Sequence, residues 1–217
     1  MQSHGDLFAT DPRAARIEIA DGAVVLRGAA LVDADAVVAQ IAAIAAISPF
    51  RRMTTPGGFE MSVAMTNCGA YGWISDRTGY RYSPVDPLIA KPWPALPAVF
   101  LKCAADTAAA AGFPGFVPDA CLINRYEPGT KLSLHQDKDE RYHAYPVVSV
   151  SLGLPAVFLF GGPRRNDKTQ RIPLSHGDVV VWGGASRLVY HGVLPLAQGE
   201  HPALGRQRIN LTLRKSQ

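Results

Sequence analysis

The sequence lacks the features that carry a chain into or across a membrane. Although 47% of its 217 residues are hydrophobic, nowhere do about 18 apolar residues run together. Its first residues, Met1 to Arg16, contain no basic flank followed by an apolar stretch, which is the pattern of an export signal. We therefore expect a soluble, cytoplasmic protein without a membrane partner.

Cysteine is scarce, and its arrangement argues against disulfide bonds. The three cysteines are Cys68, Cys103 and Cys121, and no two of them form a C-x-x-C pair. An odd number of widely spaced thiols is typical of reduced, buried cysteines in an intracellular protein. We expect no disulfide.

Repeats, low-complexity tracts and linkers are also missing, so residues 1–217 are expected to form one domain. A chain of this length and hydrophobic content can build a full core. The 22 Lys and Arg exceed the 18 Asp and Glu and give a net charge of +4. This mild basic excess is compatible with a polyanion partner such as nucleic acid, but it is common in unrelated proteins. We expect a monomer.

The apolar pattern changes once, near residue 115, and predicts an α+β fold that is mainly β. Before this point we expect two helices, Asp33 to Ile47 and Pro97 to Ala111. We assign about residues 1–115 to an N-terminal extension and about 116–217 to a jelly-roll core, because short strand-like runs there recur between Gly, Pro and Asp turns. These runs are 121–127, 132–137, 146–152, 156–160, 178–182, 188–192 and 207–214.

One of these runs contains a His-x-Asp motif. Residues two apart in an extended strand point the same way, so His135 and Asp137 would present an imidazole and a carboxylate from one face. With one further histidine they would form a two-His, one-carboxylate triad, which is typical of non-haem Fe(II) oxygenases. A lone His-x-Asp also arises by chance in a chain with six histidines, so the motif needs support from the rest of the sequence.

Four histidines downstream of the motif are candidates for the third ligand. His143 and His201 fall in expected loops, where surface positions are usual. His176 opens a Ser-His-Gly-Asp turn, where capping or solvent exposure is usual, whereas His191 ends an expected strand and precedes a glycine. A side chain at a strand end beside glycine can reach a metal, so we favour His191 over His176.

The last run is polar on one face and apolar on the other. The polar face carries Arg208, Asn210, Thr212 and Arg214. The Cα atoms of the two arginines would lie roughly 20 Å apart, and two inward-leaning side chains would leave room for a five-carbon diacid such as 2-oxoglutarate. Arginine can hold a carboxylate in a two-pronged fork, which lysine cannot. Exposed strand charges would give the same pattern.

Two further stretches carry residue types suited to ligands. Asn124 and Tyr126 are two apart in the run 121–127, so their side chains point together; they could bind a ligand or satisfy each other in a core. The stretch from Tyr71 to Tyr82 interleaves aromatic residues with cations. That mixture suits base stacking beside phosphate contacts, and it equally suits an ordinary surface hairpin.

Together these motifs make the chain resemble the AlkB family of Fe(II)- and 2-oxoglutarate-dependent dioxygenases. The matching stretches are Thr55–Gly58, Met61–Gly69, Pro118–Tyr126, Lys131–Glu140, His176–Gly184 and Asn210–Thr212. They cover the chain in order from about residue 48 to its end. The chain departs from the family pattern at Ile209 and Leu213, which are aliphatic instead of aromatic, and at Phe59, which replaces a tyrosine and so lacks one hydroxyl for a phosphate or base.

The resemblance implies a double-stranded β-helix with N-terminal helices and a nucleotide-recognition lid over its mouth. It implies that Fe(II) is bound by His135, Asp137 and His191, and that 2-oxoglutarate is bound by Asn124, Tyr126, Arg208, Asn210 and Arg214. It also places Trp73 against a flipped methylated base, Tyr80 and Tyr82 near the phosphate chain, Asp139 at the exocyclic amine of the base, and Arg165 at the rim.

The activity that the resemblance implies is direct repair of nucleic acid by oxidative demethylation. The expected substrates are N-alkylated bases such as 1-methyladenine and 3-methylcytosine in single-stranded DNA, with double-stranded DNA and RNA as alternatives. Fe(II), 2-oxoglutarate and O2 would oxidise the methyl carbon, which leaves as formaldehyde, while succinate and CO2 form. A base inside a duplex would have to be extruded first. Two other readings stay open: an oxygenase acting on a small molecule or protein, and a non-enzymatic nucleic-acid-binding jelly-roll module.

Overall fold

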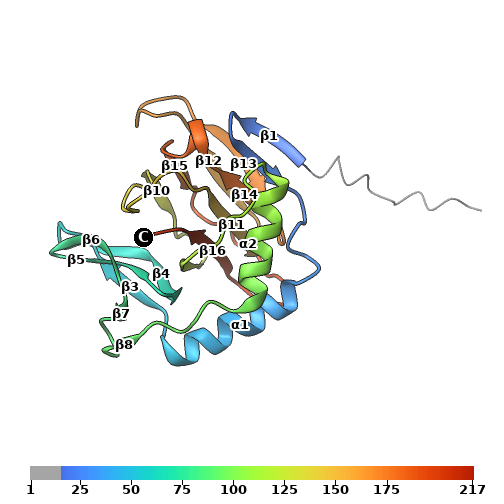
Figure 1. The fold of residues 1–217 in the computed structure, drawn as a ribbon. Coiled ribbons are helices and arrows are strands. Elements are labelled where there is room, and N and C mark those ends of the chain that lie inside the picture. Colours follow the sequence, from blue (N-terminus) through green and yellow to red (C-terminus); the bar gives the residue numbers. More distant parts are fainter. Residues whose placement is uncertain (1–15) are drawn as a thin grey trace, which may run out of the picture.

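The computed structural model describes residues 16–217. Strands make up most of the regular secondary structure of these residues, and two α-helices cover one side of the molecule (Figure 1). The export-signal pattern was sought in Met1 to Arg16, and all of those residues but the last lie outside the described part. Among residues 16–217, no helix has the length and apolar character needed to cross a membrane.

The two helices begin and end within one residue of their expected bounds. Helix α1 spans Ala34–Ile47 and α2 spans Ala98–Ala110. In α1 the buried residues Val37, Ile41 and Ile44 follow the spacing of one helical face. They join a hydrophobic cluster that also contains Phe100 of α2 and one face of the larger sheet. Packing against this sheet therefore holds both helices in place.

The larger sheet has eight antiparallel strands in the order β1-β2-β14-β11-β16-β9-β4-β3. Their bounds are Arg16–Ala20 for β1, Ala23–Leu26 for β2, Arg51–Thr54 for β3, Glu60–Gly69 for β4, Ala120–Tyr126 for β9, Val147–Gly153 for β11, Val179–Trp182 for β14 and Arg208–Arg214 for β16. The N-terminal part of the chain thus adds strands at both edges of this sheet.

The smaller sheet has four antiparallel strands in the order β10-β15-β12-β13. Their bounds are Leu132–His135 for β10, Ala156–Phe160 for β12, Gln170–Leu174 for β13 and His191–Val193 for β15. Two separate hairpins complete the fold, with β5 at Gly72–Asp76, β6 at Gly79–Ser83, β7 at Val85–Asp86 and β8 at Lys91–Pro92. The β5–β6 hairpin projects away from the helices, toward the left of Figure 1.

Alternation along the strands divides the interior into two cores. In β14, Val179 and Val181 face the helices, whereas Val180 and Trp182 join Phe158 of the smaller sheet in a second cluster. In an extended strand successive side chains point to opposite faces. The larger sheet therefore packs on helices with one face and on the smaller sheet with the other, which confirms the expected mainly β jelly roll.

The same alternation explains two departures from the family pattern. Ile209 and Leu213 lie on the helix-facing side of β16, buried in the first cluster with Leu211. Aliphatic side chains fill that space, so the polar face of β16 is unaffected. Phe59 is different, because its side chain is 76% exposed beside β4.

Two expected strands needed correction. The strand expected over 132–137 ends at His135, so Asp137 lies beyond it. The strand expected over 188–192 is instead β15, which begins at His191. The preceding residues turn through a short 3-10 helix at Gly184–Ser186, and Val189 N–H bonds to the carbonyl of Ser186 rather than to a neighbouring strand. The sequence pattern also missed β13 and the N-terminal strands.

All three cysteines lie within the described residues and are buried and free. Cys68 of β4 and Cys121 of β9 are directly opposite in the ladder. Burial raises the pKa of the Cys121 and Cys103 thiols, which keeps them protonated and unreactive. The expectation of reduced, buried thiols is confirmed.

Candidate metal and cosubstrate site

A cavity of about 520 Å³ opens between the two sheets. Side chains from β9 and β16 of the larger sheet and from β10, β12 and β15 of the smaller sheet line it. All the site residues expected from the sequence line this cavity except Tyr82. The fold therefore brings together residues that lie up to 141 positions apart in the chain, from Trp73 to Arg214.

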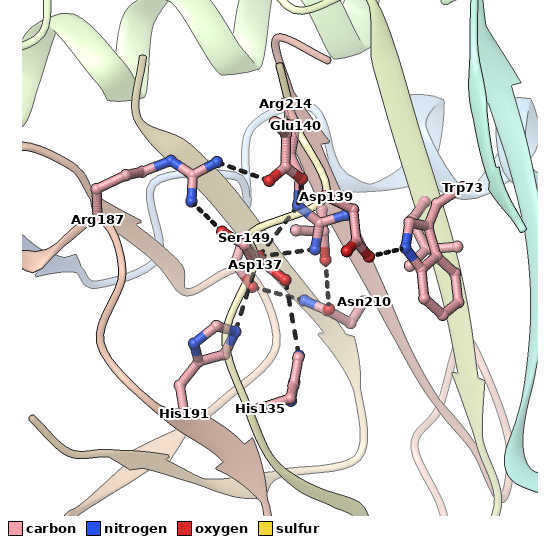
Figure 2. A network of polar contacts seen from close by, with 12 residues as sticks. Trp73, His135, Asp137, Asp139, Glu140, Ser149, Arg187, His191, Asn210 and Arg214 are labelled. Carbon is pink, nitrogen blue, oxygen red and sulfur yellow. Dashed lines mark hydrogen bonds and ion pairs between the residues drawn. The ribbon is translucent and has the colours of Figure 1, made fainter. Parts of the chain in front are cut away.

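Three candidate metal ligands converge in the cavity. His135 at the end of β10 is paired directly with His191 at the start of β15, and their ring centroids are 4.4 Å apart. The Nε2 atoms of both histidines lie 3.7 Å from a carboxylate oxygen of Asp137. Ligand atoms of all three residues lie within 4.8 Å of one another, so one ion can contact all of them (Figure 2).

Hydrogen bonds to the backbone set both histidines in the form that binds a metal. Nδ1 of His135 lies 2.9 Å from the carbonyl oxygen of Ser133, and Nδ1 of His191 lies 3.1 Å from that of Val189. A carbonyl oxygen only accepts hydrogen bonds, so each Nδ1 donates and each Nε2 offers a lone pair to the centre of the triad. Such outer hydrogen bonds are usual for metal-binding histidines, and the donor set fits Fe(II).

Neighbouring charges keep the carboxylate ligand ionised. Asp137 is buried, and burial alone would raise its pKa, but the charge of Arg214, with His191 and His135, lowers that pKa well below the usual range. Nε and Nη2 of Arg214 donate to one oxygen of Asp137 over 3.0 and 2.8 Å. Burial also lowers the pKa of His191 to about 4. At neutral pH the site therefore holds a carboxylate and a neutral imidazole, as a metal requires.

Two buried residues that the sequence reasoning missed support this arrangement. Glu140 accepts a hydrogen bond from Nη2 of Arg187 over 3.0 Å, and its other oxygen lies 3.4 Å from Nε of Arg214. Nη1 of Arg187 donates to the backbone carbonyl of Asp137 over 2.6 Å (Figure 2). No sequence pattern marked either residue, although Glu140 follows the His-x-Asp motif by three residues and Arg187 precedes His191 by four.

The polar face of β16 is held by serines of β11. Nδ2 of Asn210 donates to Oγ of Ser149 over 2.8 Å and to a backbone carbonyl, while Thr212 donates to Oδ1 of Asn210 over 3.1 Å. Nη2 of Arg208 donates to Oγ of Ser151 over 2.8 Å. This face was expected to bind ligands, and the structure shows which of its atoms are already used.

Four buried polar atoms near Arg208 have no hydrogen-bond partner among residues 16–217. They are Nε and Nη1 of Arg208, Oδ1 of Asn124 and the hydroxyl oxygen of Tyr126. The guanidinium of Arg208 lies 5.0 Å from the centre of the Tyr126 ring. Burying polar groups and a charge without partners is costly. A bound carboxylate would satisfy the guanidinium and accept from the phenol, so this end of the cavity fits one carboxylate of 2-oxoglutarate.

The two arginines of β16 differ in their surroundings. Burial lowers the pKa of Arg208, which has no carboxylate partner among the described residues. At Arg214 the Asp137 carboxylate outweighs the same effect of burial and raises the pKa. The buried charge of Arg208 is therefore available to pair with a bound anion, whereas Arg214 already forms an ion pair beside the metal ligands.

The β5–β6 hairpin brings aromatic side chains to the cavity mouth. Trp73 and Tyr80 stack with ring centroids 5.5 Å apart and planes 14° apart. Nε1 of Trp73 donates to Asp139 over 2.8 Å (Figure 2). Arg165 lies near the same cavity, with its guanidinium 5.9 Å from the centre of the Tyr190 ring. Four of the five residues expected at the substrate thus surround one opening.

Tyr82 lies outside this group. It pairs with Trp73 across the hairpin, and its hydroxyl donates to Glu140 over 2.6 Å. Burial raises the pKa of Tyr82 well above its usual value, so the phenol stays protonated and able to donate. Its expected position near a phosphate chain stays a prediction.

The other histidines among residues 16–217 do not take part in the triad. His176 accepts a hydrogen bond from the backbone N–H of Gly153 over 2.9 Å, and its ring lies 4.4 Å from that of His201. Neither of them lines the cavity, and neither does His143. Of the two candidates for the third ligand, the structure brings His191 and not His176 beside His135 and Asp137.

A jelly roll that holds two histidines and a carboxylate in an open cavity defines the class of non-haem iron oxygenases. Residues 22–214 match the family model described as the 2OG-Fe(II) oxygenase superfamily. A relative from Salmonella typhimurium, named alpha-ketoglutarate-dependent dioxygenase AlkB, is 59% identical over 211 residues, which are 97% of each chain.

Two more distant relatives also carry names of this family. The solved structure of OsALKBH1 superposes with a TM-score of 0.82 at 29% identity and covers 92% of this chain and 99% of that one. The human nucleic acid dioxygenase ALKBH1 is 38% identical over 96 residues, which are 43% of this chain and 25% of that protein. The chain therefore belongs to the AlkB family within the 2OG-Fe(II) oxygenase superfamily. It is a dioxygenase that uses Fe(II), 2-oxoglutarate and O2.

We expect alanine at His135, Asp137 or His191 to abolish 2-oxoglutarate turnover and to weaken binding of Mn²⁺, a redox-inert probe of the metal site. Titration calorimetry of the metal-free variants measures the binding. His176→Ala is the matched control, because that imidazole lies outside the cavity. Loss of Mn²⁺ binding in His176→Ala, with binding retained in His191→Ala, would show that the ligand assignment is wrong.

Proposed function

We propose that this enzyme removes methyl groups by oxidation from N-alkylated nucleobases, such as 1-methyladenine and 3-methylcytosine, in single-stranded DNA or RNA. The observation that carries the proposal is the Trp73–Tyr80 stack at the mouth of the metal cavity, with Trp73 fixed by Asp139. Stacked aromatic rings bind bases through their faces and tolerate different sequences. The name of the human relative supports nucleic acid as the substrate class.

The cavity suits an extruded base rather than one inside a duplex. The metal ligands Asp137 and His191 are buried, whereas Asp139 is exposed at the opening. A base that stacks on Trp73 would direct its methyl group inward, toward the triad, and its exocyclic amine toward Asp139. An extruded or unpaired base can enter in this way, and a paired base cannot.

The residues around Arg208 are proposed to position the cosubstrate. The guanidinium of Arg208, with Tyr126 and Asn124, would take the carboxylate remote from the metal, because these groups are buried and unpartnered. Arg214, already paired with Asp137, would lie beside the keto-acid end. The proposal thus gives different roles to the two arginines, which the sequence pattern left equivalent.

When bound, Fe(II) with 2-oxoglutarate and O2 supplies the oxidation of the methyl carbon. One oxygen atom of O2 would end in succinate and the other in formaldehyde released from the methyl group, with CO2 as the third product. The side chains of the protein orient the base and enclose the site, and none of them acts as a nucleophile.

Turnover of a single-stranded oligonucleotide that contains 1-methyladenine tests the proposal. We expect formaldehyde and succinate in equal amounts, together with the unmethylated base. The unmethylated oligonucleotide is the control and should yield no formaldehyde. If the methylated strand yields none either, while 2-oxoglutarate is still consumed, the substrate is not a methylated nucleobase and a small molecule or protein becomes the better candidate.

We expect Arg208→Lys to raise the KM for 2-oxoglutarate by about tenfold, because a point charge replaces a fork, and to leave Mn²⁺ affinity unchanged. Arg214→Lys should raise this KM and also weaken Mn²⁺ binding, since Arg214 holds Asp137. Steady-state kinetics and calorimetry measure the two effects. Arg206→Lys is the control, because Arg206 is exposed and bonded to Gln198. An unchanged KM in Arg208→Lys would contradict the cosubstrate assignment.

The charge of Asp139 should favour cationic lesions. Methylation at N1 of adenine leaves the base positively charged, whereas 3-methylthymine is neutral. Opposite charges about 4 Å apart attract by about 1 kcal/mol in water and by about 4 kcal/mol at an effective dielectric of about 20. In Asp139→Asn the amide oxygen can still accept from Trp73, so the shape and this hydrogen bond are kept while the charge is lost.

We therefore expect Asp139→Asn to lower kcat/KM for 1-methyladenine by about tenfold, and to change kcat/KM for 3-methylthymine much less. Both lesions are measured in single-stranded oligonucleotides at one fixed salt concentration. Equal losses for the two lesions would mean that Asp139 acts through geometry alone.

A further inference from the structure

Two consecutive carboxylates hold the two strands of the β5–β6 hairpin. Asp139 accepts a hydrogen bond from Trp73 of β5, and Glu140 accepts one from Tyr82 of β6. Trp73 and Tyr82 are directly opposite each other in the hairpin ladder. The two residues that follow closely after the metal ligand Asp137 thus form hydrogen bonds with one cross-strand pair of the hairpin.

The two contacts differ in their surroundings. Asp139 is exposed at the cavity mouth, whereas the side chain of Glu140 is only 2% exposed. Besides Tyr82, Glu140 contacts Arg187 over 3.0 Å and Arg214 over 3.4 Å. Arg214 in turn donates twice to Asp137. One buried carboxylate therefore connects the hairpin to the ion pair at the metal site.

We propose that Glu140 is a positioning residue that orients Arg214 on Asp137 and ties the β5–β6 hairpin to that ion pair through Tyr82. The inference rests on the metal site and not on the proposed substrate. Glu140 itself does not coordinate the metal in this proposal, since the triad is complete without it. It acts through Arg214 on one side and through Tyr82 on the other.

Charge balance supports the role of Glu140. The buried cluster contains two carboxylates, Asp137 and Glu140, and two guanidinium groups, Arg187 and Arg214. Without the charge of Glu140, two buried cations would compete for the single carboxylate of Asp137. Removing one partner of a buried ion pair leaves an uncompensated charge and is strongly unfavourable. Arg214 would then be free to change its contacts with Asp137.

The arrangement also has a consequence for the hairpin. Occupation of the metal site stabilises one arrangement of Asp137 and Arg214, and through Glu140 it would stabilise the contact with Tyr82. Binding at the metal site should therefore slow local opening of β6, although β6 contributes no ligand to the triad. Hydrogen exchange of backbone amides reports such local opening.

The test compares amide hydrogen exchange with and without Mn²⁺ and 2-oxoglutarate, in the full chain and without nucleic acid. In the unmodified protein we expect the ligands to slow exchange in residues 79–83. In Tyr82→Phe this added protection should disappear, while Mn²⁺ affinity stays within about twofold and β16 is still protected. Tyr80→Phe is the matched control for exchange. It also removes a hydroxyl group from β6, but this hydroxyl makes no hydrogen bond within residues 16–217. Exchange in Tyr80→Phe should therefore match that of the unmodified protein.

Glu140→Gln tests the other half of the proposal. It keeps the shape but removes the charge, and loss of such an outer contact usually lowers metal affinity by about tenfold or more. We expect that loss for Mn²⁺, together with loss of the added protection of β6. If Glu140→Gln does not fold, which circular dichroism detects, Tyr82→Phe still decides whether the hairpin is tied to the metal site.

Two outcomes overturn the proposal. One is normal ligand-induced protection of β6 in Tyr82→Phe, which would show that the hairpin responds by another route or independently. The other is Mn²⁺ affinity in folded Glu140→Gln equal to that of the unmodified protein. Because no nucleic acid is present, neither outcome depends on whether methylated bases are the substrate.

Discussion

The buried ion pair between Arg214 and Asp137 is the interaction on which the site depends. A buried carboxylate would take up a proton unless a cation faced it, and a protonated Asp137 would be a poor metal ligand. Arg214, which is also buried, contacts Glu140 as well as Asp137. Arg187 then balances Glu140 and holds the backbone at Asp137. Each buried charge thus requires the next, and the cluster ends neutral.

Because this cluster of four side chains is neutral, it supplies no net charge to offset that of the metal or the cosubstrate. Fe(II) brings two positive charges and 2-oxoglutarate brings two negative charges, so the pair adds no net charge to the cavity. Arg208 is a further buried cation outside this balance, and two of its nitrogens have no partner. The cosubstrate carboxylate at that end would remove the remaining cost of burial. The site is therefore built for metal and diacid together rather than for either one alone.

Several features were predictable from the sequence because they follow from local patterns. Stop signals directly after residues 47 and 111 indicated where both helices end, and the two-residue pattern of β16 separated Arg208 and Arg214 from the apolar residues that pack on the helices. The His-x-Asp motif gave two members of the triad. The third, His191, had to be chosen among candidates, because a strand pairing between β10 and β15 brings it to His135 and no local pattern records that pairing.

Other features were not predictable because they depend on contacts between distant segments. Glu140 and Arg187 look like ordinary surface charges in the sequence, and only the fold buries them against each other. Tyr82 has the alternation of a hairpin residue, yet its hydroxyl is used by Glu140 rather than facing the cavity. The strands β1 and β2 are short, and β2 pairs with the edge of β14 while β1 pairs with β2.

That edge has a further consequence. Strand β14 contains three consecutive valines, Val179 to Val181, and its outer side is covered by β2, which is covered in turn by β1. An apolar strand with unpaired backbone groups can pair with a strand of another molecule. The β1–β2 hairpin covers the edge of β14, so that β1 becomes the outer strand. The first three residues of β1 are exposed and include Arg16 and Glu18. The exposed edge of the sheet is therefore a strand with charged residues, which disfavours pairing with another molecule and is separate from the chemistry of the cavity.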